Sequence, residues 1–189
     1  VSRFTLRTRR AEDGFGTEVS IAGGKLQDVT DCGCPSGTCI EVRDLFFNVP
    51  ARRKFLRGER TEFSHIEDGL CRLALSRFVV GFGLWHNQRV TLDWDSALDS
   101  EARSRRVADR LGRDFAVANV FFDRNEAGLH LWGWLGLPAV SRAQPDQQYY
   151  FVNGRPVRDR TLAHAMRQAY QDILPQGRHP ALVLHLDFE

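Results

Sequence analysis

Residues 37–57 read Gly-Thr-Cys-Ile-Glu-Val-Arg-Asp-Leu-Phe-Phe-Asn-Val-Pro-Ala-Arg-Arg-Lys-Phe-Leu-Arg, the most distinctive stretch of the chain. β-Favouring residues dominate its first part, which predicts a strand over residues 38–45 after a glycine-containing loop. Pro50 breaks this strand, because proline fixes its own φ angle and biases the residue before it away from the helical region. A short helical turn over residues 51–56 is expected to follow.

A cluster of basic side chains surrounds this proline. Between residues 43 and 60 the chain carries six basic residues and two acidic ones, in a chain that nets only +2. The basic residues are Arg43, Arg52, Arg53, Lys54, Arg57 and Arg60. On the expected turn, Arg53 and Arg57 share a face with Lys54. Phe55 and Leu56 would point to the core. Such a cluster can neutralise several phosphates at once, with little dependence on base sequence, although a solvated helix face also fits these residues.

The overall composition excludes several classes of protein. With 189 residues, 42% of them hydrophobic, the chain can build a core, which excludes disordered and collagen-like chains. Its longest apolar run, residues 78–85, falls far short of the roughly 20 residues that cross a bilayer. All but two of the 26 basic residues are arginines. Arginine favours forked contacts to carboxylates or phosphates, although genomic base composition can produce the same bias.

The cysteines raise the question of a metal site. Cys32, Cys34 and Cys39 form a C-x-C-x4-C cluster, and with a histidine such as His65 they supply the ligand types of zinc. The chain has no paired C-x2-C knuckles, however, and Cys39 falls in a strand pattern whose alternate side chains should be buried. We therefore expect reduced thiols and no metal site. The six histidines are scattered without a catalytic or metal-binding spacing, so we expect none to be a catalyst.

Hydrophobic periodicity predicts both strands and helices along the rest of the chain. Strands are expected at residues 3–9, 17–21, 78–86, 89–94, 115–122, 128–135, 149–153 and 181–188, with turns at 13–16, 87–88, 124–126 and 154. Helices are expected at residues 61–77, at 100–111 and from Asp159 or Thr161 to Ile173, with Thr61 and Ser100 as N-caps. This mixture indicates an α+β fold in two unequal halves. The acidic stretch from Asp93 to Glu101 predicts a domain boundary near residue 95.

Two motifs, in order along the chain, resemble those of a known family. Residues 37–57 are similar to the fourth ATPase motif of the MutL DNA mismatch repair proteins, which belong to the GHKL superfamily with gyrase, the ninety-kilodalton chaperone and histidine kinases. A second block, Tyr150-Phe-Val-Asn-Gly-Arg155 with Arg158-Asp-Arg160, resembles the Val-Asn-Gly-Arg segment of the domain that follows the ATPase in this family. Two long motifs at a suitable separation make the resemblance specific, and it extends through nearly the whole chain.

The resemblance implies an architecture. Residues 1–95 would be the C-terminal part of a GHKL-type ATPase α/β sandwich that carries its fourth motif. Residues 96–189 would be most of a gyrase/ribosomal-protein-like transducer domain, truncated at its end. Because the chain opens with Val1 and stops at Glu189, inside an expected strand, we expect an internal fragment of a longer bacterial protein.

The resemblance also implies a function. The parent would be an ATP-gated, dimeric matchmaker that links mismatch recognition to strand nicking and removal, with ATP and Mg as cofactors. Its partners would be DNA through backbone contacts, a second copy in a homodimer, a MutS-type recognition protein, a nicking endonuclease and a helicase, in the cytoplasm with the nucleoid and not at a membrane. The family's catalytic glutamate, magnesium-holding asparagine and glycine-rich motifs are absent from this sequence. The fragment would therefore carry no catalytic residue, and we expect no bound cofactor.

The resemblance assigns two kinds of contact to individual residues. Gly37 and Thr38 would contribute to the adenine end of a nucleotide pocket, although a glycine turn entering a strand explains both without a ligand. Four basic residues would lie along a groove that takes the DNA backbone: Lys54, Arg57, Arg72 and Arg160. The positive end of a helix would favour a phosphate beside Arg160. Arg155 has two open roles, pairing with a carboxylate to fix its loop or contacting DNA.

Two alternatives from other classes of protein remain at this point. A stand-alone, basic-faced α+β nucleic-acid-binding module without ATPase ancestry would need solvent-facing aromatic platforms, for which the candidates are Trp132, Trp134, Tyr149 and Phe151. We expect at least one face of each to be buried. An inert scaffold would require the basic cluster of residues 43–60 to be fully paired with acids.

A second run of arginines is interpreted as structural. Arg103, Arg106, Arg110 and Arg113 recur at helical spacing. Glu101 and Asp109 lie four residues before Arg105 and Arg113, a spacing that favours ion pairs within a helix. We therefore expect a solvated helix face here, not a nucleic-acid contact.

Overall fold

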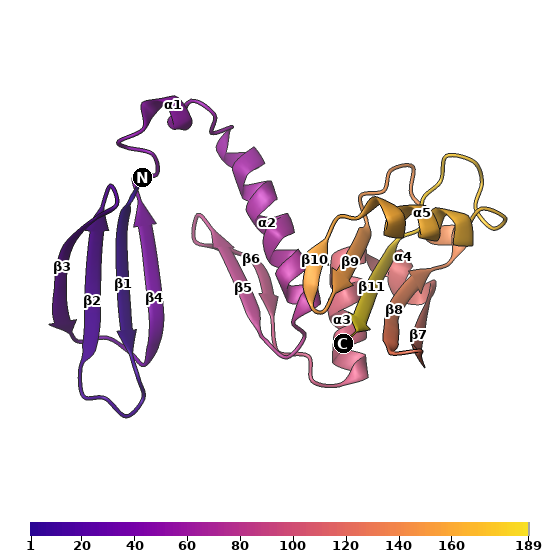
Figure 1. Ribbon diagram of the computed structural model, residues 1–189, viewed down its shortest axis with the longest axis horizontal. Coiled ribbons are helices and arrows are strands. Elements are labelled where there is room, and N and C mark those ends of the chain that lie inside the picture. Colours follow the sequence, from indigo (N-terminus) through magenta and orange to yellow (C-terminus); the bar gives the residue numbers. More distant parts are fainter. Residues whose placement is uncertain (189) are drawn as a thin grey trace. The chain divides into compact units, whose positions relative to one another are not determined.

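Alternating side chains near the N-terminus form an antiparallel sheet of four strands in the order β3-β2-β1-β4 (Figure 1). The strands are β1 (Arg3–Arg9), β2 (Gly16–Ala22), β3 (Lys25–Cys32) and β4 (Gly37–Arg43). This computed structural model describes residues 1–188 and divides into two compact units, residues 1–62 and the residues from 63 onward. The sheet and the short helix α1 (Pro50–Arg53) belong to the first unit, and α2 (Glu59–Ser76) begins at its end.

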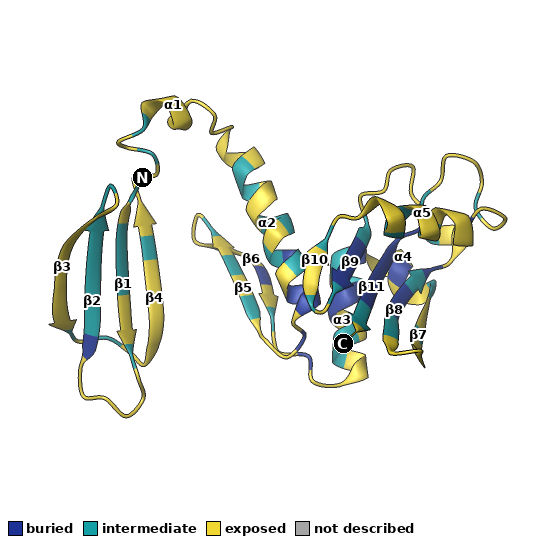
Figure 2. Ribbon diagram, viewed as in Figure 1, coloured by how far each residue is buried: buried dark blue, intermediate teal, exposed yellow. Residues whose placement is uncertain are grey.

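One face of this sheet is apolar across all four strands. The register aligns eight side chains on it: Leu26, Val29, Val19, Ile21, Phe4, Leu6, Ile40 and Val42. Those on the edge strands are open to solvent, with Leu26 62% and Ile40 57% exposed. In Figure 2 the buried part of this sheet is confined to the start of β2. An apolar sheet face of this size is one that another layer normally covers.

The second unit is built on a mixed sheet of five strands in the order β10-β9-β11-β8-β7. Its strands are β7 (Asn119–Glu126), β8 (Leu129–Gly136), β9 (Gln148–Val152), β10 (Arg155–Val157) and β11 (Leu182–Phe188). The central strand β11 pairs in parallel with β9 and antiparallel with β8. A separate two-stranded hairpin, β5 (Phe82–His86) and β6 (Arg89–Trp94), follows α2 in the chain.

Helices pack on both faces of the five-stranded sheet. They are α2, α3 (Ser100–Leu111), α4 (Arg113–Val117), the 3-10 turn η1 (Pro138–Val140) and α5 (Arg160–Ala169). On one face Leu75, Val107 and Phe115 of α2, α3 and α4 belong to a single core cluster with the sheet. On the other face Leu162 and Met166 of α5 pack against a second cluster. The strands β9 and β11 are thus covered on both sides, which explains their near-continuous apolar sequences (Figure 2).

Tight turns set the strand order in both units. Four connections consist of two residues with positive φ: Gly23-Gly24, Asn87-Gln88, Ala127-Gly128 and Asn153-Gly154. Two-residue turns of this kind match the right-handed twist of the strands that they join. The expected turns at 87–88 and at Gly154 are therefore confirmed. The turn expected at 124–126 is wrong, because β7 continues to Glu126.

Two expected strand starts are wrong, and two strands were not expected. Residues 113–117 form α4, so the strand expected from residue 115 begins only at Asn119. Phe115 is 2% exposed, and burial of its ring against the sheet overrides the β-favouring run. Residues 78–81 precede β5 and do not belong to it. Sequence analysis also fails to predict β3 and the three-residue β10.

The helix starts differ from expectation in two of three cases. α2 begins at Glu59, so Thr61 lies inside the helix and does not cap it. Asp99 caps α3 by accepting a backbone N–H at 2.7 Å, which makes Ser100 the first helical residue. Asp159, one of the two expected starts, caps α5 by accepting a backbone N–H at 2.9 Å, and the helix ends at Ala169, before the expected Ile173.

Two further features concern the cysteines as possible metal ligands and the helices as possible membrane spans. Cys39 is exposed on the polar face of β4, so the expectation that it lies among buried alternate side chains is wrong, whereas Cys71 is buried. Within residues 1–188, no group of three or more His, Cys, Asp or Glu side chains is arranged to hold a metal ion. No helix in the same range combines the length and the apolar content needed to cross a membrane.

Candidate nucleic-acid interface

The basic cluster of the first unit lies on and after α1. Because α1 ends at Arg53, Lys54 and Arg57 lie in the connection to α2 and not on a helix face. Both side chains are exposed. The expectation that Phe55 and Leu56 point to the core is wrong, since Phe55 is 83% exposed and Leu56 40%. A helix of four residues is too short to present an apolar face that could bury them.

Carboxylates neutralise little of this cluster. Arg43 pairs with Glu41 on the same strand. Among residues 1–188, no ion pair is formed by Arg52, Arg53, Lys54 or Arg57. The condition for an inert scaffold, a fully paired basic cluster, is therefore not met in the part of the chain that the structure describes.

A strained bend directs the chain from β4 into the basic segment. Asp44 and Phe46 have φ angles of 52° and 63°, which non-glycine residues rarely adopt. The Asp44 carboxylate lies 3.1 Å from the Arg3 Nε atom, and the Phe46 N–H donates to the carbonyl of Val1 at 2.6 Å. Contacts with the start of the chain therefore hold a backbone conformation that would otherwise be unfavourable.

The two residues assigned to a nucleotide lie at the start of β4. Gly37 has a φ of 112°, which side-chain-bearing residues rarely adopt, and no atom lies within 4 Å of the position that a Cβ would take. The Thr38 hydroxyl lies 2.9 Å from the hydroxyl of Thr8, its cross-strand neighbour. Both hydroxyls are exposed at the end of the apolar face. A turn and a cross-strand pair are the contacts that the structure gives these two residues.

The second unit brings Arg72 and Arg160 together. Both line one cavity of about 570 Å³, together with Arg158. Arg160 is the first residue of α5, where the helix N-terminus contributes a partial positive charge. Three carboxylates also line this cavity: Asp68, Asp146 and Asp159. Lys54 and Arg57 belong to the first unit.

Asp68 of α2 gathers three guanidinium groups around one carboxylate. Arg72 Nε donates to it at 2.9 Å, Arg110 Nη2 donates at 3.0 Å, and Arg158 Nη2 lies 3.9 Å away. The Arg72 side chain is 19% exposed, and its guanidinium lies over the Tyr149 ring, 4.9 Å from the centroid. Arg72 is therefore fixed and partly neutralised, which weakens it as a phosphate contact.

Tyr149 fixes Arg110 beside this carboxylate. Arg110 Nε donates to the Tyr149 hydroxyl at 2.7 Å. Burial raises the pKa of Tyr149, and the charge of Arg110 offsets part of that rise. Since the phenol stays protonated near neutral pH, this contact orients Arg110 and supplies no proton chemistry.

The arginine run on α3 does not form the expected solvated face. Arg106 is 3% exposed and donates to four backbone carbonyls, those of Ala74, Arg77, Val80 and Asp95. The expected pair of Glu101 with Arg105 is confirmed at 2.6 Å. Arg113 begins α4, so it does not share a helix with Asp109 and the second expected pair is wrong.

Comparison with known proteins decides the family. A family model described as DNA mismatch repair protein, C-terminal domain, matches residues 107–189. The DNA mismatch repair protein MutL of Pseudomonas paraeruginosa is 49% identical over 190 residues that cover 100% of this chain, and the chain spans 30% of that relative's length. The ATPase domain from the bacterial mismatch repair endonuclease Aquifex aeolicus MutL is 30% identical, with a TM-score of 0.74, and the match covers 100% of this chain and 67% of that one. The chain belongs to the MutL family.

Two further solved structures place the fold of this MutL chain. The Aquifex aeolicus MutL ATPase domain complexed with ADP is 28% identical, with a TM-score of 0.77, over 100% of this chain and 68% of that one. The B-subunit of the DNA gyrase from Myxococcus xanthus is 13% identical, with a TM-score of 0.50, over 99% of this chain and 57% of that one, a likeness of fold alone. These matches confirm the expected α+β fold of the GHKL ATPase type.

The Val-Asn-Gly-Arg motif of the MutL family forms the turn between β9 and β10. Asn153 and Gly154 have φ angles of 47° and 69°. The Asn153 side chain donates to the Phe188 carbonyl at 3.0 Å and accepts the Phe188 N–H at 2.9 Å. Arg155 is exposed and forms no ion pair among the described residues. The interpretation that Arg155 fixes this loop is therefore wrong, because Asn153 does so.

MutL membership and burial together exclude the stand-alone nucleic-acid module. Trp134, Tyr149 and Phe151 are at most 2% exposed, so none of them offers a ring to a nucleic-acid base. Trp132, the fourth candidate, is partly buried against the same core and stacks one face on His185. The expectation that each of the four rings has at least one buried face is therefore confirmed. His185 also lies in the core, at 2% exposure, which agrees with a structural interpretation of that histidine.

Sequence reasoning missed Asp68 and Arg158 as residues of this candidate site. Asp68 precedes Arg72 by four residues on α2, and this spacing is a recognised signal for an ion pair. The approach of Arg158 to Asp68 joins residues 90 positions apart in the chain and has no local signal. Only the paired β9-β10 hairpin reveals it.

Proposed function

We propose that this chain is part of an ATP-gated, dimeric MutL protein that binds DNA and links mismatch recognition to strand nicking and removal. The observation that carries the proposal is Arg160, which is exposed at the N-terminus of α5 and forms no ion pair among the described residues. Guanidinium groups beside a helix N-terminus favour a phosphate. The chain spans 30% of its MutL relative, so the complete activity belongs to a longer protein.

The proposed partners follow from the same role. They are the DNA backbone, a second copy of the protein, a MutS-type mismatch recognition protein, a nicking endonuclease and a helicase, in the cytoplasm with the nucleoid. Binding of ATP would bring two N-terminal regions together and create the groove for DNA. Such an ATPase uses hydrolysis as a timer for conformational change.

The open apolar face of the first sheet supports the proposed architecture. In this proposed architecture, residues 1–95 are part of the ATPase domain and residues 96–189 are most of the transducer domain. An α/β sandwich requires a helical layer on its sheet. The apolar side chains of β3 and β4 are exposed and suited to such a layer, which the rest of the ATPase domain would supply.

Gly37 and Thr38 would form one edge of a nucleotide site. A relative's ATPase domain is described as complexed with ADP, and we propose ATP and Mg as cofactors of the whole protein. The catalytic glutamate, the asparagine and the glycine-rich motifs of the family are absent from this sequence, so the residues present do not complete the site. A calorimetric titration of the chain with ATP should therefore show no saturable binding in the micromolar range. Micromolar affinity would contradict this expectation.

Charge reversal at α5 tests the proposed DNA contact. Arg160→Glu should weaken binding to a short fluorescein-labelled duplex about five- to tenfold, because it removes one phosphate contact and adds a repulsive charge. The slope of log affinity against log salt should fall by about one. Fluorescence anisotropy across a salt series, with duplex and single-stranded DNA, measures both quantities. Arg124→Glu makes the same charge change at an exposed residue of β7 and is the matched control.

Two further variants extend this test to the first unit. Lys54→Glu and Arg57→Glu should each weaken binding in the same way, since both side chains are exposed and lack a carboxylate partner in residues 1–188. The proposal fails if the unmodified chain shows no salt-dependent binding. It also fails if all three variants bind as tightly as Arg124→Glu.

A further inference from the structure

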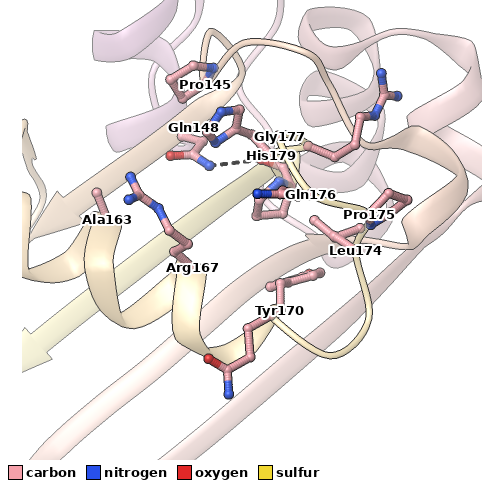
Figure 3. Close-up of a pocket in the computed structure, with 13 residues that line it drawn as sticks. Pro145, Gln148, Ala163, Arg167, Tyr170, Leu174, Pro175, Gln176, Gly177 and His179 are labelled. Carbon is pink, nitrogen blue, oxygen red and sulfur yellow. Dashed lines mark hydrogen bonds between the residues drawn. The ribbon is translucent and has the colours of Figure 1, made fainter.

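A second cavity of the second unit, of about 460 Å³, lies beside the C-terminal half of α5 (Figure 3). Arg167, Arg178 and His179 line it, with three glutamines and several apolar residues. No aspartate or glutamate is among its described lining residues. None of the residues assigned to DNA from the sequence lines this cavity.

Of the two cavities beside α5, the one at Arg167 carries a net positive charge and the one at Arg160 does not. Three arginines and three carboxylates line the cavity at Arg160, so their formal charges cancel. The cavity at Arg167 has two arginines and no carboxylate. An anion is therefore attracted more strongly to the cavity at Arg167.

One guanidinium of this cavity is fixed and the other is free to adapt. Arg178 Nε donates to Ser141 Oγ at 3.1 Å, and Arg178 Nη2 donates to the Ser141 carbonyl. Arg167 is exposed, and in Figure 3 its guanidinium is turned toward Gln148. Gln148 is held in turn by its hydrogen bond to the Pro180 carbonyl at 3.2 Å. The cavity thus presents a partly pre-organised pair of arginines.

The two cavities are continuous along one face of α5. They share three lining residues, Pro145, Gln148 and Ala163. Arg160 and Arg167 are seven residues apart, which is about two helical turns and about 10.5 Å along the axis. Each nucleotide advances about 3.4 Å along a DNA strand, so this separation corresponds to about three nucleotides.

We propose that the cavity at Arg167 binds a phosphodiester of the DNA backbone, with Arg167 and Arg178 as its contacts. The inference rests on the proposed DNA-binding function and extends the contact surface along α5. Continuity with the cavity at Arg160 favours a nucleic-acid backbone over an acidic protein segment, because a backbone passes from one cavity to the next. The glutamine amides of the cavity are also groups that donate to phosphate and sugar oxygens.

Charge reversal of the free arginine tests the inference on the full chain. Arg167→Glu should weaken binding to the labelled duplex about five- to tenfold and lower the salt slope by about one. Arg167→Lys should bind within about twofold of the unmodified chain, since it keeps the charge. Arg124→Glu again controls for net charge, and circular dichroism checks that each variant is folded.

A second measurement does not depend on a variant. Labelling of arginines with phenylglyoxal, read by mass spectrometry, should show that DNA protects Arg167 and leaves Arg124 reactive. If the unmodified chain binds no DNA, the proposed function itself fails. If Arg160→Glu weakens binding but Arg167→Glu does not, and DNA leaves Arg167 reactive, only the extension along α5 is overturned, whether or not an acidic protein binds there.

Discussion

Replacing Arg106 by alanine should lower the free energy of unfolding by about 3–5 kcal/mol. Its buried guanidinium forms no ion pair among residues 1–188 and donates to four backbone carbonyls. Two of these carbonyls, of Ala74 and Arg77, lie at the end of α2, where the last carbonyls lack helical donors. Burial lowers the pKa of Arg106, but the negative end of the α2 dipole favours its charge. Without the guanidinium, each carbonyl left buried and unpaired costs about 1–3 kcal/mol.

Urea unfolding followed by tryptophan fluorescence measures this loss, because Trp132 and Trp134 lie in the same unit as Arg106. Arg105→Ala is the matched control. It removes only an exposed pair with Glu101 on the same helix and should change the free energy of unfolding by less than about 0.5 kcal/mol. A loss of less than about 1 kcal/mol in Arg106→Ala would show that the four hydrogen bonds contribute little.

Turn chemistry makes much of the fold readable from the sequence. Asn87-Gln88 and Gly154 lie between alternating runs, and both form the expected hairpin turns. Gly23-Gly24 is a signal of the same kind, and it would have predicted the hairpin that adds β3. Phe115 has no such signal. Its neighbours favour a strand, and only the burial of its ring in the assembled core explains the short helix α4.

The side-chain partners of the site are less predictable than its elements. Arg160 and Arg167 share a face of an expected helix, so their alignment follows from spacing alone. The cavity at Arg167 also depends on the segment after α5 folding back on that helix, which local patterns do not reveal. The exposure of Phe55 has the same origin, because a sequence pattern indicates which side chains could be buried but not whether a neighbour exists to bury them.

His185 should make the folded chain less stable as the pH falls from about 6.5 to about 4. Its side chain on β11 is stacked between Trp132 and Phe151, with ring centroids 3.9 Å and 4.6 Å away. Burial lowers the pKa of His185 to about 4, while the charge of Asp187 raises it and that of Arg103 lowers it further. The Nε2 atom is buried without a hydrogen-bond partner in the described residues, so no acceptor is present there for an added proton.

The sign of the effect follows from which state binds the proton first. In the unfolded chain the imidazole binds a proton near pH 6.5, whereas in the folded chain it does so only near pH 4. Between these values the unfolded state holds more protons, so its population increases as the pH falls. The full contribution to stability is present above about pH 6.5, and the loss reaches about 3 kcal/mol by about pH 4.

Urea unfolding near pH 7, 5 and 4 measures this dependence, and a variant separates it from the titration of carboxylates. His185→Phe keeps an aromatic ring between Trp132 and Phe151 but binds no proton. Over the same pH range, the variant should therefore lose about 3 kcal/mol less free energy of unfolding than the unmodified chain. His164→Gln, at an exposed position of α5, should follow the unmodified chain and is the matched control. If His185→Phe lost as much stability as the unmodified chain, the buried imidazole would not be the group that responds to acid.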